Sequence, residues 1–134
     1  MTLEQLNENF VLHQRLERAY DMMESLRDRA GLRAASLSAM PKGQEVSDRV
    51  GEIAAAAADL SQRIRELEDL TEQGDAAVRQ FANTLPDERV QQTVLLRFVA
   101  CLSWEKTAEL LGPRYSSRGL QKLLRRTLGE DQAP

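Results

Sequence analysis

The residues best suited to bind a ligand lie near the carboxyl end, in a basic segment from Gly112 to Leu128. This segment holds cationic side chains and no acidic one; the cations are Arg114, Arg118, Lys122, Arg125 and Arg126. The first 85 residues have the opposite balance, with 10 Lys and Arg against 15 Asp and Glu. Guanidinium and ammonium groups bind nucleic-acid phosphates and donate hydrogen bonds to base edges. The segment is therefore a candidate nucleic-acid interface in an otherwise acidic protein.

A helix over residues 117–128 presents these side chains. If Leu120 and Leu124 face the core, together with Thr127 or Leu128, helical spacing turns a polar set outward. The residues that we expect to contact DNA in the major groove are Ser117, Arg118, Gln121, Lys122 and Arg125. The cations that we expect at the margins, as phosphate contacts, are Lys106, Arg114 and Arg126. The alternative is a solvated basic helix that only complements the acidic part of the chain.

Two shorter helices precede this one. Residues 85–88 contain a proline and two acids, which are typical of a helix start. Ser103 is suited to cap a second helix, and Gly112-Pro113 ends it. Ser116 or Ser117 is suited to cap the third. Three short helices with breaks of this kind predict a helix-turn-helix module.

The same residues resemble region four of sigma-70-type transcription factors. The matching segments are Leu85-Pro86, Val94-Leu95-Leu96-Arg97-Phe98, Leu102-Ser103-Trp104-Glu105-Lys106-Thr107-Ala108-Glu109-Leu110-Leu111-Gly112 and Ser117-Arg118-Gly119-Leu120. Region-four domains place their last helix in the DNA major groove at promoters and also touch RNA polymerase. The resemblance therefore implies double-stranded DNA and RNA polymerase as partners. Cys101 stands where that family often has the glycine that closes the first of these helices.

The first 85 residues carry two apolar seams with helical spacing. The first seam consists of Leu12, Leu16, Ala19, Met23, Leu26 and Ala30. The second consists of Val50, Ile53, Ala57, Leu60, Ile64, Leu67 and Thr71. Steps of three and four residues place each set on one side of a helix. We therefore expect two long helices, over 3–39 and 48–84.

The segment between the two seams predicts a turn. Pro41 disfavours helix at Met40, Gly43 supplies turn freedom, and Ser47 is suited to cap the second helix. Two helices of equal length that are joined by a short turn favour an antiparallel pair. The predicted fold class is all-α: a long antiparallel helical hairpin over 1–85, followed by a three-helix helix-turn-helix module over 86–134. The hairpin is expected to form a homo-oligomer or to contact a partner, since a two-helix layer buries little.

The composition excludes several classes of protein. Three Phe, two Tyr, one Trp, 7 Gly and 4 Pro are too few for a β-sandwich or barrel. One cysteine, Cys101, and one histidine, His13, provide no internal disulfide and no cluster of metal ligands. No phosphate loop, nucleophile elbow or zinc-protease motif occurs, so we assign no enzyme activity, no cofactor and no metal.

The longest apolar run, Ile53 to Ala58, is too short to cross a membrane, and the amino-terminal residues do not form a signal peptide.

Three functions fit these features. The whole chain resembles a family of small phage and prophage regulators that end in the same module, which implies a transcription regulator in the cytoplasm of a bacterial host cell. A phage DNA-packaging protein similar to a small terminase also combines a small helix-turn-helix with an oligomerising arm. A helical adaptor without a nucleic-acid role is the third possibility, and it predicts no retention on DNA.

Overall fold

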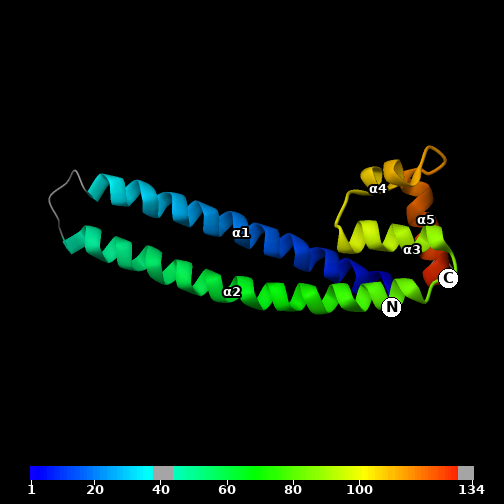
Figure 1. Cartoon of the computed structure of the whole chain (residues 1–134), viewed down its shortest axis with the longest axis horizontal. Helices are drawn as coiled ribbons and strands as arrows, with labels where there is room; N and C mark the ends of the chain where they lie inside the picture. The colour runs from blue at the N-terminus through cyan, green and yellow to red at the C-terminus, as the bar shows by residue number, and fades with distance from the viewer. Residues whose placement is uncertain (38–43, 130–134) are drawn as a thin grey trace. The chain divides into compact units, whose positions relative to one another are not determined.

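The fold is described from a computed structural model, which covers residues 1–37 and 44–129, with side chains described for 1–31 and 48–129. The α-helices are α1 (Leu3–Leu37), α2 (Gln44–Asn83), α3 (Glu88–Val94), α4 (Trp104–Leu111) and α5 (Ser117–Leu128), and a π-helix, η1 (Leu95–Val99), continues α3 (Figure 1). The described residues contain no strand, so the predicted all-helical fold class is confirmed for them. Within the same residues, no helix has both the length and the apolar character needed to cross a membrane.

The long helices differ from the predicted ones in one respect. The second begins at Gln44, ahead of the predicted start at residue 48, so the prediction of Ser47 as its N-cap is wrong. Gln44 and Glu45 are good helix formers, so the helix extends back to them. The predicted turn at Met40 to Gly43 lies outside the described residues.

The chain divides into two compact units, and each long helix contributes to both. We call Met1–His13 with Leu70–Pro134 the core unit, and Gln14–Asp69 the arm unit. The units divide the chain at positions other than the predicted boundary between residues 85 and 86. The ends of α1 and α2 belong with the last fifty residues because their apolar side chains pack into the same cluster.

The core unit is held together by one hydrophobic cluster. Its buried members are Leu6, Val78, Ala82, Leu85, Val90, Val94, Phe98 and Leu124. Leu6 comes from α1, Val78 and Ala82 come from α2, and all three are at most 1% exposed. Val90 and Val94 of α3 and Phe98 of η1 supply the other side of the cluster. Residues well before position 85 therefore complete the core of the carboxyl-terminal helices.

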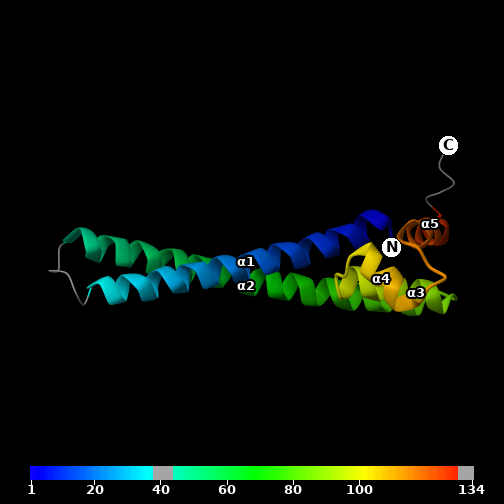
Figure 2. The ribbon, with the colours of Figure 1, turned by 90° about the horizontal axis from the view of Figure 1, so that it is seen from above.

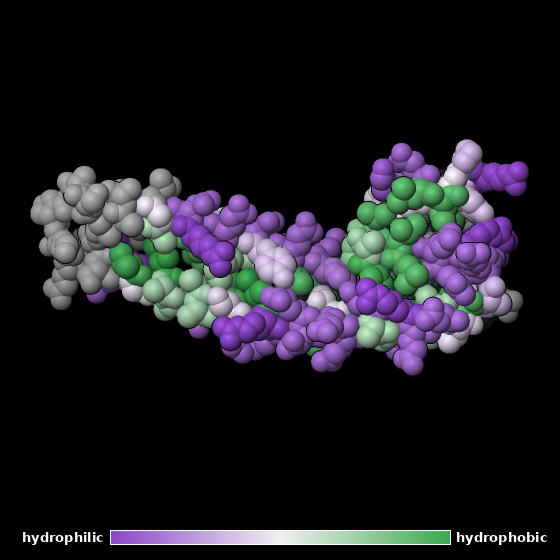
Figure 3. Space-filling model, viewed as in Figure 1, coloured by the Kyte–Doolittle hydropathy of each residue, from purple (hydrophilic) through white to green (hydrophobic). Residues whose placement is uncertain are grey.

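The arm unit contains the carboxyl-terminal part of α1 and the amino-terminal part of α2, which run antiparallel (Figure 1, Figure 2). Four of the predicted seam residues in this unit are buried, which are Ala19, Met23, Ile64 and Leu67. Others, such as Leu26, are half-buried, whereas Ala30 is exposed and Val50 is 42% exposed. Apolar side chains are visible between the hydrophilic edges of this unit in Figure 3. The arm unit thus leaves part of its seam open to solvent.

Candidate nucleic-acid interface

Helix α4 begins and ends where the sequence predicts. The hydroxyl of Ser103 accepts a hydrogen bond from the backbone N–H of Lys106 at 3.0 Å, which satisfies a free donor of the first turn. The helix ends at Gly112, whose φ of 125° is a backbone conformation that other residues rarely adopt. A turn of four further residues then leads into α5.

Helix α5 is anchored by leucines and capped by a serine. Ser116, one of the two predicted candidates, is the N-cap, and its hydroxyl accepts from the N–H of Gly119 at 3.0 Å. Leu120 and Leu124 are each 1% exposed, as predicted. Leu128 completes the inner side as a half-buried residue, whereas Thr127 is exposed. The helix packs against α3 and α4 and crosses α3 steeply (Figure 1, Figure 2).

The predicted DNA-contacting residues fall into two groups. Arg118, Lys122 and Arg125 are exposed on the side of α5 opposite Leu120 and Leu124. Ser117 and Gln121 are half-buried and do not share that side. The reason is helical periodicity: Ser117 lies three positions before Leu120 and therefore near the buried side of the helix. The exposed basic face of α5, defined as Arg118, Lys122 and Arg125, is narrower than the predicted set.

The predicted phosphate contacts lie on three different elements, and all are exposed. Lys106 lies on α4 and pairs with Glu109, with 3.6 Å between Nζ and Oε2. Arg114 lies in the turn between α4 and α5. Arg126 lies in the last turn of α5, where a cation is stabilised by the negative end of the helix dipole. The helix itself carries no Asp or Glu, so all of its charged side chains are cationic.

The start of α3 carries an ion pair that the sequence did not reveal. The Arg89 guanidinium donates two hydrogen bonds to the Asp87 carboxylate, at 3.1 Å and 2.9 Å. These bonds lower the pKa of Asp87 and raise the pKa of Arg89. Asp87 also accepts from the backbone N–H of Arg89 at 2.9 Å, so the same carboxylate caps α3 and holds Arg89.

In the core unit, the side chain of Arg97 lies between two aromatic rings. The Arg97 guanidinium lies 4.0 Å from the ring centre of Phe10 and 5.2 Å from that of Trp104, and it donates to the carbonyl of Leu102 at 2.9 Å. Trp104 is half-buried and meets Phe98 edge to face, with the ring centres 6.0 Å apart. Burial lowers the pKa of Arg97.

A buried amide joins α1 to the π-helix. The Nδ2 group of Asn9 donates to the Phe98 carbonyl and to Oδ1 of Asp75, both at 2.9 Å, and Asn9 is 4% exposed. Nε2 of His13 lies 2.6 Å from the same Asp75 oxygen. We call Asn9, His13, Asp75 and the Phe98 carbonyl the polar clamp. No spacing pattern marked it, because its members lie on three segments far apart in the sequence.

Cys101 lies shortly after η1, in a backbone conformation that suits glycine. Its φ of 58° lies in the left-handed region, which costs an L-residue roughly 1–2 kcal/mol. The thiol makes long contacts to two backbone oxygens, at 3.7 Å and 3.9 Å. Cys101→Gly is therefore expected to raise the free energy of unfolding by about 1 kcal/mol in urea denaturation.

Cys101→Ala is the matched control for this prediction. Alanine keeps the unfavourable φ and loses the thiol, so no gain in stability is expected. If the alanine variant gained as much as the glycine variant, backbone conformation would not be the cause.

Comparison of the chain with protein-family models, curated proteins and solved structures finds no match. Among the residues that the structure describes, no group of three His, Cys, Asp or Glu side chains is placed to hold a metal ion. The basic face of α5 is therefore assessed on its own geometry.

Proposed function

We propose that this chain is a sequence-specific DNA-binding regulator of transcription, of phage or prophage type. In this proposal α4 and α5 form a helix-turn-helix, and α5 enters the major groove. Arg118, Lys122 and Arg125 contact bases and nearby phosphates, and Ser117 and Gln121 contribute from the edges of the helix. Lys106, Arg114 and Arg126 bind the DNA backbone on either side. The protein acts in the cytoplasm of a bacterial host cell, with RNA polymerase as a second partner.

One observation carries this proposal: α5 buries its leucines and presents cations on the opposite side. Leu120 and Leu124 are 1% exposed, whereas Arg118, Lys122 and Arg125 are exposed. A helix anchored through its apolar side is suited to insert its polar side into a groove. Arginine and lysine donate to the O6 and N7 atoms of guanine, and both neutralise phosphates.

The proposal also assigns self-association to the arm unit. Dimeric DNA-binding proteins read paired half-sites, and a protein with one short recognition helix gains affinity from a second copy. The incomplete burial of the arm seam supports this assignment, because apolar residues such as Leu16 and Leu60 stay half-buried in the single chain.

Removing the basic face tests the proposal. In the triple variant Arg118→Ala, Lys122→Ala, Arg125→Ala, the affinity for duplex DNA selected by the full chain is expected to fall at least tenfold. If the five cations of residues 112–128 each neutralise one phosphate, the slope of log affinity against log salt for the unchanged chain is about −4.5. The triple variant is expected to flatten this slope by about 2.7. Fluorescence anisotropy across a salt series measures both quantities.

A variant with the same change in charge provides the control. Arg18, Arg29 and Arg49 are exposed on the arm unit, and their joint replacement by alanine should leave the affinity nearly unchanged. Absence of DNA binding by the unchanged chain would favour the helical adaptor instead. Equal losses in both triple variants would show that net charge, and not α5, controls binding.

A further inference from the structure

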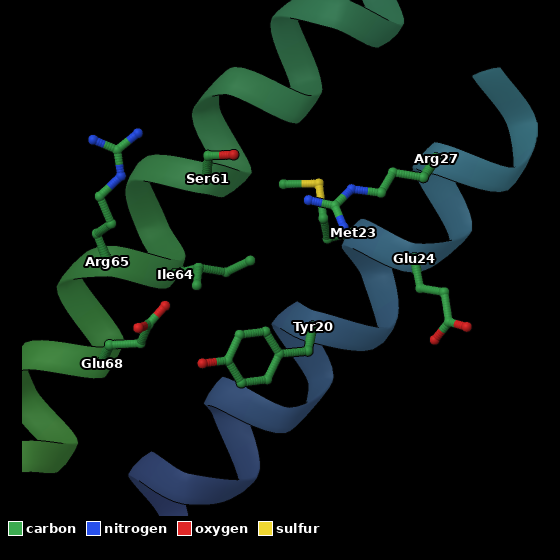
Figure 4. A pocket seen from close by; sticks show the side chains of 8 residues that line it. All are labelled: Tyr20, Met23, Glu24, Arg27, Ser61, Ile64, Arg65 and Glu68. Atoms are coloured by element: carbon green, nitrogen blue, oxygen red, sulfur yellow. The ribbon is translucent and has the colours of Figure 1, made fainter. Parts of the chain in front are cut away.

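The arm unit contains a groove that is lined by residues of both seams, Met23 and Ile64. The groove has a volume of about 620 Å³ and lies between α1 and α2 (Figure 4). Its floor is formed by Met23 and Ile64, which are 7% and 8% exposed. Polar and charged side chains from both helices form its rim. An apolar floor with a charged rim is a typical arrangement for a surface that receives another protein.

The charges of the rim are separated along the groove. Arg27 stands at one end, toward the carboxyl end of α1, and reaches toward Met23, on the same level as Ser61 (Figure 4). Glu68 stands at the other end, beside Tyr20, with which it shares a hydrogen bond. Arg65 and Glu24 point outward from the two helices: the Arg65 guanidinium lies near the level of Ser61, and the Glu24 carboxylate lies near the level of Tyr20 (Figure 4). The groove is therefore positive at one end and negative at the other.

This polarity makes the groove complementary to itself. We infer that the occupant of the groove is the same groove of a second copy of this chain, with the two arm units facing each other in opposite directions. In that arrangement Arg27 of each copy lies level with Glu68 of the other, so the contact is repeated twice by the two-fold axis. The open parts of both seams are then buried in a four-helix core.

The charges distinguish this arrangement from the parallel one. If the two arms faced each other in the same direction, Arg27 would lie level with the partner subunit's Arg27, and Glu68 would lie level with the partner subunit's Glu68. Like charges facing each other across an interface are unfavourable, and they act against incorrect partners and registers. The antiparallel dimer replaces both repulsions by attractions.

This inference deepens the self-association assigned to the arm in the proposed function and rests on it, but it does not depend on DNA binding.

The test is a pair of charge reversals in the full chain, Arg27→Glu and Glu68→Arg. Each variant alone brings like charges together twice, so its dimer dissociation constant is expected to rise tenfold or more. In an equimolar mixture the two reversed side chains face each other, and the unchanged Glu68 of one variant faces the unchanged Arg27 of the other. Both contacts then join opposite charges, so the mixture is expected to restore the dimer.

Light scattering coupled to size exclusion measures these states, and circular dichroism checks that each variant is helical. Arg29→Glu and Asp69→Arg make the same charge changes at exposed positions outside the groove, and they should leave the dimer intact. If neither groove variant weakens the dimer, or if the mixture stays monomeric, the antiparallel arrangement is overturned. The self-association of the arm is not affected by that result. A monomeric unchanged chain overturns both the inference and the self-association of the arm, while DNA binding is judged separately by anisotropy.

Discussion

Leu6→Ala is expected to lower the free energy of unfolding of the core unit by about 2–5 kcal/mol. Leu6 has no exposed surface, although it lies in the second turn of the first helix. It packs in the cluster that contains Val94, Phe98 and Leu124, more than eighty residues further along the chain. The loss combines the transfer free energy of the missing methyl groups with the cost of the cavity that remains.

Val11→Ala is the matched control, because Val11 lies on the same helix and is 47% exposed. A change within about 0.5 kcal/mol is expected for it. The single tryptophan, Trp104, packs against Phe98 in the core unit, so its fluorescence in a urea titration reports the unfolding of this unit. Equal losses in the two variants would contradict the assignment of Leu6 to this core.

The same cluster determines which fragments are useful for DNA-binding experiments. A fragment of residues 86–134 lacks Leu6, Val78, Ala82 and Leu85, which form one side of its core. It exposes Val90, Val94 and Phe98 to water, and burial of such side chains supplies most of the stability of a small unit. The DNA measurements proposed above therefore use the full chain.

Gly74→Ala is expected to lower the free energy of unfolding by about 2 kcal/mol, although alanine is the better helix former. A Cβ atom at Gly74 would lie 2.0 Å from Oδ1 of Asn9, closer than any stable contact. Asn9 would have to move, and its hydrogen bonds to Asp75 and to the Phe98 carbonyl would be lost from a buried site. Gly74 is thus required by the polar clamp.

The change in the free energy of unfolding caused by Gly74→Ala is expected to reverse its sign when Asn9 is replaced by alanine. In an Asn9→Ala background the clash disappears, and Gly74→Ala should raise the free energy of unfolding by about 1 kcal/mol through helix propensity alone. A double-mutant cycle by urea denaturation measures the coupling, expected to be about 3 kcal/mol. Gly51→Ala, at a position with nothing within 4 Å of the added atom, should stabilise its helix in either background. Additive effects of the Asn9 and Gly74 substitutions would contradict the clamp.

Local signals predicted the elements of the fold with differing success. Ser103 was a correct N-cap prediction, because capping depends on a hydroxyl and on backbone groups three residues away. Ser47 was a wrong one, because good helix formers before it extend α2 back to Gln44. On α5 the burial of Leu120 and Leu124 followed from spacing, whereas Ser117 was assigned to the outer side despite lying one turn before Leu120.

The amino-acid sequence by itself determined the helical class, the two seams, the breaks between the short helices and the concentration of positive charge near the carboxyl end. These properties depend on residue type and on spacing within one or two turns. Only the tertiary structure decided that Leu6 and Val78 complete the core around Phe98, and that Asn9 and Arg97 meet their partners on other segments. Such contacts join residues many positions apart, and no periodicity within one helix specifies which distant side chain will fill a given space.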